Sequence, residues 1–468
     1  MANTSQKIAI STVAQIAGRF AQAALGLASV ALLTRYLGVN GYGEYSTIFA
    51  FTGLAAVIAD FGTTTLIIRE ATQRRAPIGD LVGSGVAVSV IIGTLTSAAF
   101  AVATAFMPYP AHVKGGILVA LIAVFVGNLN IYGSFFSIRT RLDMMVLIET
   151  LGRVVSVGAL AAAVFAHAPF IWIIAAAPLG MAFNAVFGTV LVLRRGIRLR
   201  VDPALVRHIL KHSLPIGLVY TLSLIQYRFD AVILSVMRPA VDVAIYVLAS
   251  KILDIVVMIP AFFLAAAYPA LSAAYASNAD FRAKSRLVFN YLLIIGLPVV
   301  TGTFLLAPKI VGILGSSDLA GAAVPLQILC GSALLGYLAG YYANIALVAG
   351  LQRRMIWRAA VVVAFNVAAN IALIPAFGYN GAAAAAVASS LLSVLLGLSL
   401  LRGRVHIGLD GGLLVRTLAA VAVMAAGVLL ARNLNTALIL AVGILSYAVA
   451  IFLLKIIRPA DLRKIIAR

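Results

Sequence analysis

Apolar runs long enough to cross a bilayer recur along almost the whole chain. A membrane-spanning helix needs about 20 mostly apolar residues, and fourteen stretches come near or exceed that length. They cover residues 8–33, 45–68, 79–106, 114–137, 146–166, 169–193, 213–237, 243–271, 287–308, 321–349, 357–376, 380–401, 412–431 and 436–457. The pattern predicts an all-α polytopic membrane protein with about 14 transmembrane helices.

Positive charge alternates between the connections of these spans. Of the 35 Lys and Arg residues, 26 lie in the terminal segments and every second loop, five lie in the other loops, and four lie inside spans. Cytoplasmic loops carry the excess of Lys and Arg in membrane proteins. Both termini are therefore predicted to be cytoplasmic. The net charge of +21 follows from this topology, and its spread over many short loops argues against a nucleic-acid partner.

A weak hydropathy repeat divides the chain into two similar parts. The seventh span begins about 205 residues after the first, and Arg358 in the second part corresponds to Arg153 in the first. Transporters are often built from two such lobes in the same orientation. We predict an N-lobe with six spans, an amphipathic cytoplasmic linker, a C-lobe with six spans, and two further spans with a basic tail, over residues 1–200, 201–212, 213–405 and 406–468.

The linker has a good helix start, because Asp202 can cap the first turn and Pro203 fits its first position. Its apolar and basic side chains fall on different faces, which predicts a helix lying on the cytoplasmic surface. Solvated basic loops are an equally good interpretation of this segment and of the tail.

Four basic residues lie inside predicted spans, where a charge is costly unless it faces a partner or a watery cavity. They are Arg19, Arg153, Arg228 and Lys251. Arg19 is about 11 residues into its span, roughly 17 Å from the cytoplasmic end. Together these residues could form a cationic cavity for phosphate, with Arg as a bidentate donor and Lys as a point charge.

Each of the four also has a structural interpretation. Lys251 and Asp254 are three residues apart on one helix and could neutralise each other. Arg228 could pair with an acid on another helix, such as Asp254. For Arg153, near the cytoplasmic end of its span, a structural or interfacial role is favoured over substrate binding.

Three acids, Asp60, Asp230 and Asp254, are candidates for ion coupling, because a carboxylate in a membrane cavity can bind a proton or sodium. For Asp60, a helix-end or packing role is the stronger alternative. Tyr337 and Tyr341 share one helix face, and so do Asn366 and Asn370. Such groups can contact sugars, but interhelical hydrogen bonds are their commoner role.

Signals of catalysis or metal binding are missing from the sequence. It contains no metalloprotease, serine-hydrolase, P-loop or dinucleotide-binding motif. Its single cysteine, Cys330, allows no intrachain disulfide. The loops on the outer side are too short for an active-site domain. We therefore expect neither an enzyme nor a cofactor or metal.

Three short segments resemble the Wzx-type polysaccharide flippases of the multidrug/oligosaccharidyl-lipid/polysaccharide exporter superfamily. They are LGVNGYGEY at residues 37–45, ADFG at 59–62, and NIALIPAFGYNGAA at 370–383. The resemblance extends over nearly the whole chain. It implies a two-lobed, V-shaped bundle in the bacterial inner membrane.

The function that this resemblance implies is the transfer of an undecaprenyl-pyrophosphate-linked oligosaccharide from the cytoplasmic to the periplasmic leaflet by alternating access. The resemblance also implies membrane lipids and the polysaccharide polymerase machinery as partners. In this chain Arg19, Arg228 and Lys251 could hold the pyrophosphate. Two alternatives stay open: a flippase for the peptidoglycan precursor lipid II, and a drug/cation antiporter of the same superfamily, against which the four basic residues inside spans argue. A membrane enzyme such as a polysaccharide polymerase or ligase is disfavoured, because the large outer loop expected of that class is absent.

Overall fold

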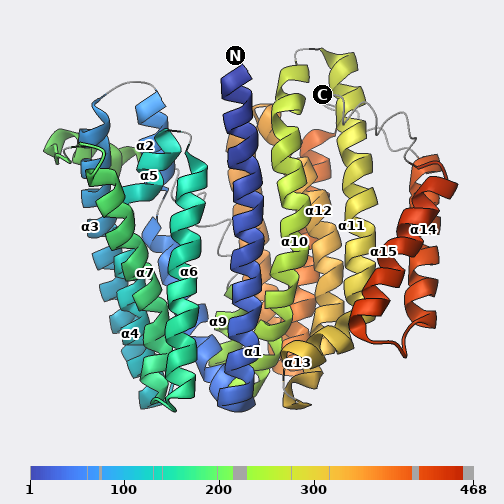
Figure 1. The fold of residues 1–468 in the computed structure, drawn as a ribbon, viewed down its shortest axis with the longest axis horizontal. Coiled ribbons are helices and arrows are strands. Elements are labelled where there is room, and N and C mark those ends of the chain that lie inside the picture. The colour runs from blue at the N-terminus through green and yellow to red at the C-terminus, as the bar shows by residue number, and fades with distance from the viewer. Residues whose placement is uncertain are drawn as a thin grey trace. The chain divides into compact units, whose positions relative to one another are not determined.

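The computed structural model describes residues 2–60, 62–72, 76–129, 131–139, 141–197, 199–213, 229–275, 277–315, 317–402 and 411–456. Within these ranges the regular structure is helical (Figure 1). Eleven of the described helices are long and apolar enough to cross a membrane. The prediction of an all-α polytopic membrane protein is confirmed.

Two of the eleven helices each contain two of the predicted spans. The chain turns at Gly38 (φ 65°, ψ −176°) within α1 and at Gly378 (φ 57°, ψ −135°) within α13. Both turns fall between consecutive predicted spans. Glycine permits these turns because it adopts positive φ at little cost. The predicted span at 213–237 lies mostly outside the described residues. With these assignments, the eleven helices account for thirteen of the fourteen predicted spans.

Two predicted spans are interrupted in the structure. Gly62, with φ 68°, separates the end of α1 from α2, so the predicted helix at 45–68 is broken. Another break separates α4 from α5, where the Asn128 side-chain amide donates to the carbonyl of Val124 (2.8 Å). Hydropathy missed both breaks because the few polar residues at each break, such as Asp60 and Asn128, are averaged with the long apolar sequence around them.

The chain divides into two compact units, residues 1–244 and 245–468. The first unit contains α1 (Ala2–Asp60), α2 (Thr63–Thr72), α3 (Ile78–Phe106), α4 (Ala111–Gly127), α5 (Ile131–Ile138), α6 (Leu142–Phe165), α7 (Phe170–Leu193), a helix at 203–213, and α9 (Phe229–Met237). Its boundary falls later than the predicted linker. The reason is that α9 packs on α1, with Val232 in the same apolar core as Ile48 and Ile117.

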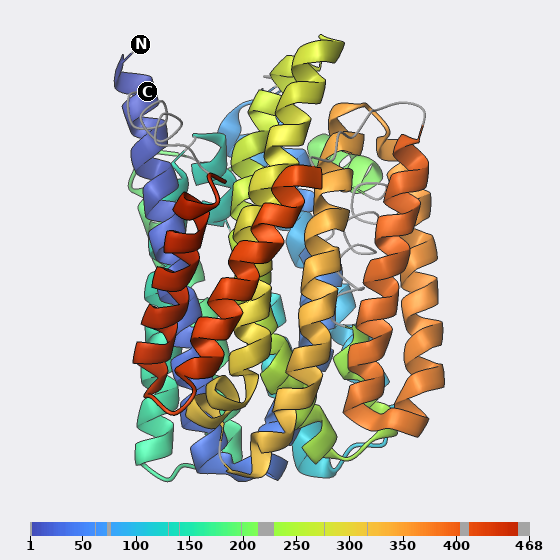
Figure 2. The same cartoon turned by 90° about the vertical axis from the view of Figure 1, so that its right-hand side faces the viewer.

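The second unit begins within α10 (Ala240–Ala274). It continues with α11 (Asn278–Leu314), the short helix η1 (Ser317–Ala322), α12 (Ala323–Val348), α13 (Gln352–Leu401), α14 (Gly411–Leu430) and α15 (Thr436–Leu453). Figure 2 shows α14 and α15 as a neighbouring pair of helices, and they contact the rest of the unit through α11. Large apolar side chains on the outer faces, such as Leu430 and Ile444, suit contact with lipid.

The helix at 203–213 is amphipathic, and its apolar side packs on protein. Ile209 is fully buried with Leu66 and Val88 in a small apolar cluster, and Val206 and Leu210 pack beside it. The Asp202 carboxylate accepts a hydrogen bond from the amide of Ala204 (2.8 Å). The linker helix is therefore docked on the first unit, because its apolar face fits the cluster beneath it.

Candidate functional site

Helices α1 and α6 lie side by side, and their facing side chains form what we call the α1–α6 seam: Gly18, Arg19, Gln22 and Gly26 on α1, with Val146, Glu149, Thr150 and Arg153 on α6. The residue numbers of the contacting pairs increase together along α1 and α6, so the two helices run parallel. A Cβ on Gly18 would collide with Val146. Glycine at this position therefore permits the close approach.

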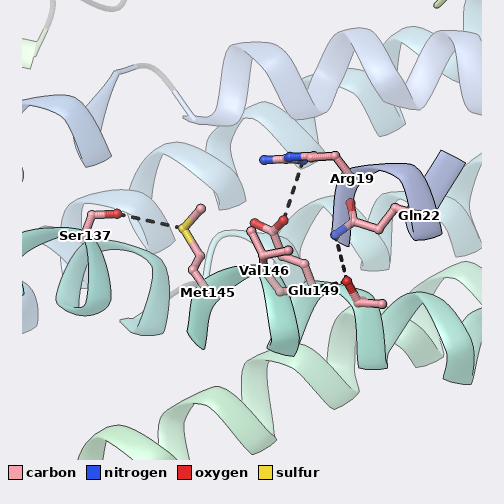
Figure 3. Close-up of polar contacts among 7 residues, drawn as sticks. Arg19, Gln22, Ser137, Met145, Val146 and Glu149 are labelled. Carbon is pink, nitrogen blue, oxygen red and sulfur yellow. Dashed lines mark hydrogen bonds and ion pairs between the residues drawn. The ribbon is translucent and has the colours of Figure 1, made fainter. Parts of the chain in front are cut away.

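Arg19 faces Glu149 across this seam (Figure 3). Its guanidinium Nη1 lies 3.6 Å from the Oε2 atom of Glu149. One turn along, the Gln22 side-chain amide donates to the Thr150 hydroxyl (3.2 Å). The Arg19 side chain is still 44% exposed and that of Glu149 26%. A partly exposed ion pair within membrane-spanning helices indicates a polar surface rather than contact with acyl chains.

Arg153 brings a second positive charge to the same seam. It follows Glu149 by one turn of α6, it is exposed, and its Nη2 atom lies 3.2 Å from the place that a Cβ on Gly26 would occupy. The α1–α6 seam therefore carries two guanidiniums and one carboxylate, which is a net positive charge. An anion with several oxygens is the ligand that such a group can bind.

The depth of Arg19 differs from the expectation. Glu149 is seven residues from the start of α6, or about 10 Å along the helix axis. Arg19 pairs at this level, which is about 8 Å short of the midpoint of the 24-residue helix α6. The expected depth was counted from residue 8, whereas α1 begins at Ala2 and extends past the start of α6 at this end.

Apart from Asp60, the other charged candidates lie on other elements or outside the described residues. Arg228 lies outside the described residues. Asp230 is buried in the first turn of α9. In the second unit, Lys251 Nζ lies 3.8 Å from Asp254 Oδ2, and both side chains are about half exposed. The pairing of Lys251 with Asp254 is the structural interpretation that the sequence offered.

Asp60 lies at a cavity of about 240 Å³ inside the first unit. The polar residues around the cavity are Thr52, Asp60, Thr64, Ser89, Asn128 and Ser134. The Thr64 hydroxyl donates a hydrogen bond to the Asp60 carboxylate. A cavity of this size has room for several water molecules. Asp60 and its polar neighbours therefore line a space that a small cation or a proton could reach.

The two tyrosines are part of the buried core of the second unit. Tyr341 is fully buried, and its hydroxyl contacts the Ser285 hydroxyl (2.7 Å) and donates to the Ser285 carbonyl (3.0 Å). The Tyr337 hydroxyl donates to the carbonyl of Val256 (2.8 Å). These contacts join α12 to α11 and α10, as expected for interhelical hydrogen bonds.

Asn366 and Asn370 are also buried, on the first half of α13. The Asn366 amide donates to the Ser389 hydroxyl (3.1 Å) in the second half of the same helix. The Asn370 amide donates to the carbonyl of Asn366 (2.9 Å). The two halves of α13 are thus joined by a polar contact about three helical turns away from Gly378.

Sequence reasoning missed the partners of these residues. Glu149 is an acid within a predicted span, and that was the available signal for its role. Gln22 and Thr150 carry no comparable signal. Among the described residues, no cluster of three or more His, Cys, Asp or Glu side chains could hold a metal ion.

Comparison with solved structures gives the fold. The lipid II flippase MurJ, in an inward closed conformation, is similar with a TM-score of 0.77 and 15% identity, over 95% of this chain and 100% of that one. An inward-facing multidrug resistance MATE transporter of the MOP superfamily matches with a TM-score of 0.67 and 15% identity, over 83% and 96%. A MOP superfamily transporter from Pyrococcus furiosus, described as having a binding pocket of reverse polarity, matches with a TM-score of 0.62 and 15% identity, over 84% and 94%.

Sequence comparison gives the family. A search of curated proteins finds no match. The family model described as polysaccharide biosynthesis protein matches residues 6–275, which is more than half of the chain and includes the whole α1–α6 seam. The chain therefore belongs to the polysaccharide biosynthesis protein family, and it has the fold of the MOP superfamily transporters.

Proposed function

We propose that the protein flips an undecaprenyl-pyrophosphate-linked oligosaccharide from the cytoplasmic to the periplasmic leaflet of a bacterial inner membrane. The observation that carries the proposal is the membership of a polysaccharide biosynthesis family in a chain that has a transporter fold. Two arginines on the α1–α6 seam add a binding group for an anion. The product would serve the synthesis of O-antigen, capsule or exopolysaccharide.

In this proposal the cationic residues hold the pyrophosphate while the sugar occupies polar space and the lipid tail stays in the bilayer. Arg19 and Arg153 supply guanidinium forks, which match the geometry of phosphate oxygens. Arg228 and Lys251 are proposed as further cationic contacts. Alternating access then requires that the loaded headgroup favours one conformation over the other, since a ligand shifts an equilibrium only through differential affinity.

Asp60 is proposed as an ion-coupling residue because it faces the polar cavity of the first unit. Binding of a proton or a monovalent cation there would give the cycle a direction set by the ion gradient. Asp230 and Asp254 remain weaker candidates, since the first is buried with a partner and the second pairs with Lys251.

A lipid II flippase is the second candidate function. The structural similarity to MurJ favours this function. That similarity covers 95% of this chain and 100% of MurJ, whereas the similarity to the MATE transporter covers 83% of this chain and 96% of the transporter. A drug antiporter is disfavoured, since the seam carries net positive charge and would repel a cationic drug.

The test is depletion of the protein in its own cell, followed by leaflet-resolved mass spectrometry of polyprenyl-linked sugars. The proposal predicts a complete oligosaccharide repeat unit accumulating on the cytoplasmic side, with loss of surface polysaccharide and no lysis. Accumulation of lipid II with lysis would instead assign the protein to the peptidoglycan precursor. Unchanged polyprenyl-linked sugars would contradict both functions.

A further inference from the structure

Glu149 lies beside the Arg19 guanidinium, which a bound phosphate would also have to approach. Its carboxylate is 3.6 Å from the Arg19 guanidinium, beyond ordinary hydrogen-bond range but close enough for an ion pair. Arg153, one turn later on α6, is exposed, and its guanidinium lies beside Gly26 of α1. Figure 3 shows Glu149 and Arg19 pointing toward one another across the seam.

We infer that Glu149 is an internal counter-ion, which occupies Arg19 when no substrate is bound and is displaced by the phosphate of the incoming headgroup. The inference rests on the proposed function and adds a residue that regulates its anion site. A carboxylate and a phosphate offer the same kind of oxygen acceptors to a guanidinium. They therefore compete for one donor.

The loose geometry of the pair suits this exchange. A buried ion pair with several hydrogen bonds would be costly to break, whereas a partly exposed pair at 3.6 Å is weak. Without Glu149, the empty transporter would hold an uncompensated arginine within the membrane span, which is unfavourable. With it, the empty state is neutralised and the substrate can still enter and leave.

Removing the competitor should tighten anion binding. Partly exposed ion pairs of this kind shift equilibria by up to about five-fold. Glu149→Gln keeps the size of the side chain and its ability to accept a hydrogen bond while removing the charge. We expect this variant to bind phosphate oxygens more tightly by that factor.

The experiment titrates inorganic pyrophosphate into the full-length protein in nanodiscs of neutral lipid, by isothermal titration calorimetry. Glu149→Gln should lower the dissociation constant about two- to five-fold. The matched control is Asp143→Asn, which makes the same charge change on the same helix. The Asp143 carboxylate pairs with Arg141 rather than with Arg19. The dissociation constant of the Asp143→Asn variant for pyrophosphate should therefore stay at the wild-type value.

Two further variants separate the possible failures. Arg19→Gln should weaken pyrophosphate binding, and adding Glu149→Gln to it should give little further gain. An affinity that is unchanged or reduced in Glu149→Gln overturns the counter-ion role while leaving the anion site intact. An affinity that does not depend on Arg19 overturns the anion site as well.

Glu149→Asp supplies an independent check should the glutamine variant fold poorly. Its shorter side chain draws the carboxylate away from Arg19, and we expect a smaller gain in affinity than for Glu149→Gln. A loss of affinity in this variant at an unchanged melting temperature would show that Glu149 positions Arg19 for binding, contrary to the inference.

Discussion

At the residue scale, removing the Tyr341 hydroxyl distinguishes a structural role of this tyrosine from a role in sugar binding. This hydroxyl makes two hydrogen bonds to Ser285 in a fully buried setting. Tyr341→Phe leaves the Ser285 groups without this partner, so we expect a loss of roughly 1–2 kcal/mol in stability with transport retained. Thermal unfolding of the purified protein in detergent measures the loss.

Tyr275→Phe is the matched control, because Tyr275 is 43% exposed and its change should leave the melting temperature near the wild-type value. If Tyr341→Phe keeps its stability and loses transport, the hydroxyl contacts the sugar instead.

A substitution of Asp60 tests its proposed role in ion coupling, also at the residue scale. Asp60→Asn keeps the shape of the side chain at the cavity but cannot be ionised, so we expect transport to lose its dependence on an imposed proton or sodium gradient. The rate at which the lipid-linked oligosaccharide moves between the leaflets of proteoliposomes, with and without the gradient, measures this dependence. Ser89→Ala, also at the cavity but uncharged, should retain the dependence. A gradient response that survives in Asp60→Asn would remove Asp60 from the coupling role.

At the element scale, the turn at Gly38 decides where α1 changes direction. Its φ of 65° and ψ of −176° lie in a region that essentially only glycine occupies. No other group lies within 4 Å of a Cβ added there, so the cost of Gly38→Ala is conformational, about 1–3 kcal/mol. The melting temperature and the yield of folded protein should both fall.

Gly53→Ala provides the comparison on the same element. Gly53 is helical, and a Cβ added there also meets no atom within 4 Å. Alanine is favoured over glycine in a helix interior by about 0.5–1 kcal/mol, so this change should leave stability equal or higher. Equal melting temperatures for the two variants would contradict the role given to Gly38.

The elements themselves were largely predictable, and the contacts between them were not. Apolar length located the spans, since crossing a bilayer fixes how many apolar residues a helix needs. The pairing of Arg19 with Glu149 joins residues 130 positions apart, and hydropathy contains no information on which helices become neighbours. For the same reason the cavity beside Asp60 could not be foreseen from the helix end on which it sits.

At the scale of the whole molecule, the orientation in the membrane can be tested with single cysteines. The native Cys330 is 1% exposed, so it should react little with a membrane-impermeant thiol reagent. We expect Arg194→Cys and Arg353→Cys to react only after the cytoplasmic side is opened. Ala111→Cys and Asp318→Cys should react in cells whose inner membrane is intact. The reverse pattern would contradict the charge-based topology.

The central claim, that the protein moves a pyrophosphate-linked oligosaccharide through a site containing Arg19, is tested most directly in proteoliposomes. The purified protein is reconstituted with the lipid-linked oligosaccharide on one leaflet, and appearance of the sugar on the other leaflet is followed with a glycosidase that cannot cross the membrane. We predict transfer by the wild-type protein, a large loss in Arg19→Gln, and transfer near the wild-type rate in Arg141→Gln, whose residue pairs outside the seam. Equal transfer by the wild-type protein, Arg19→Gln and protein-free vesicles would contradict the account.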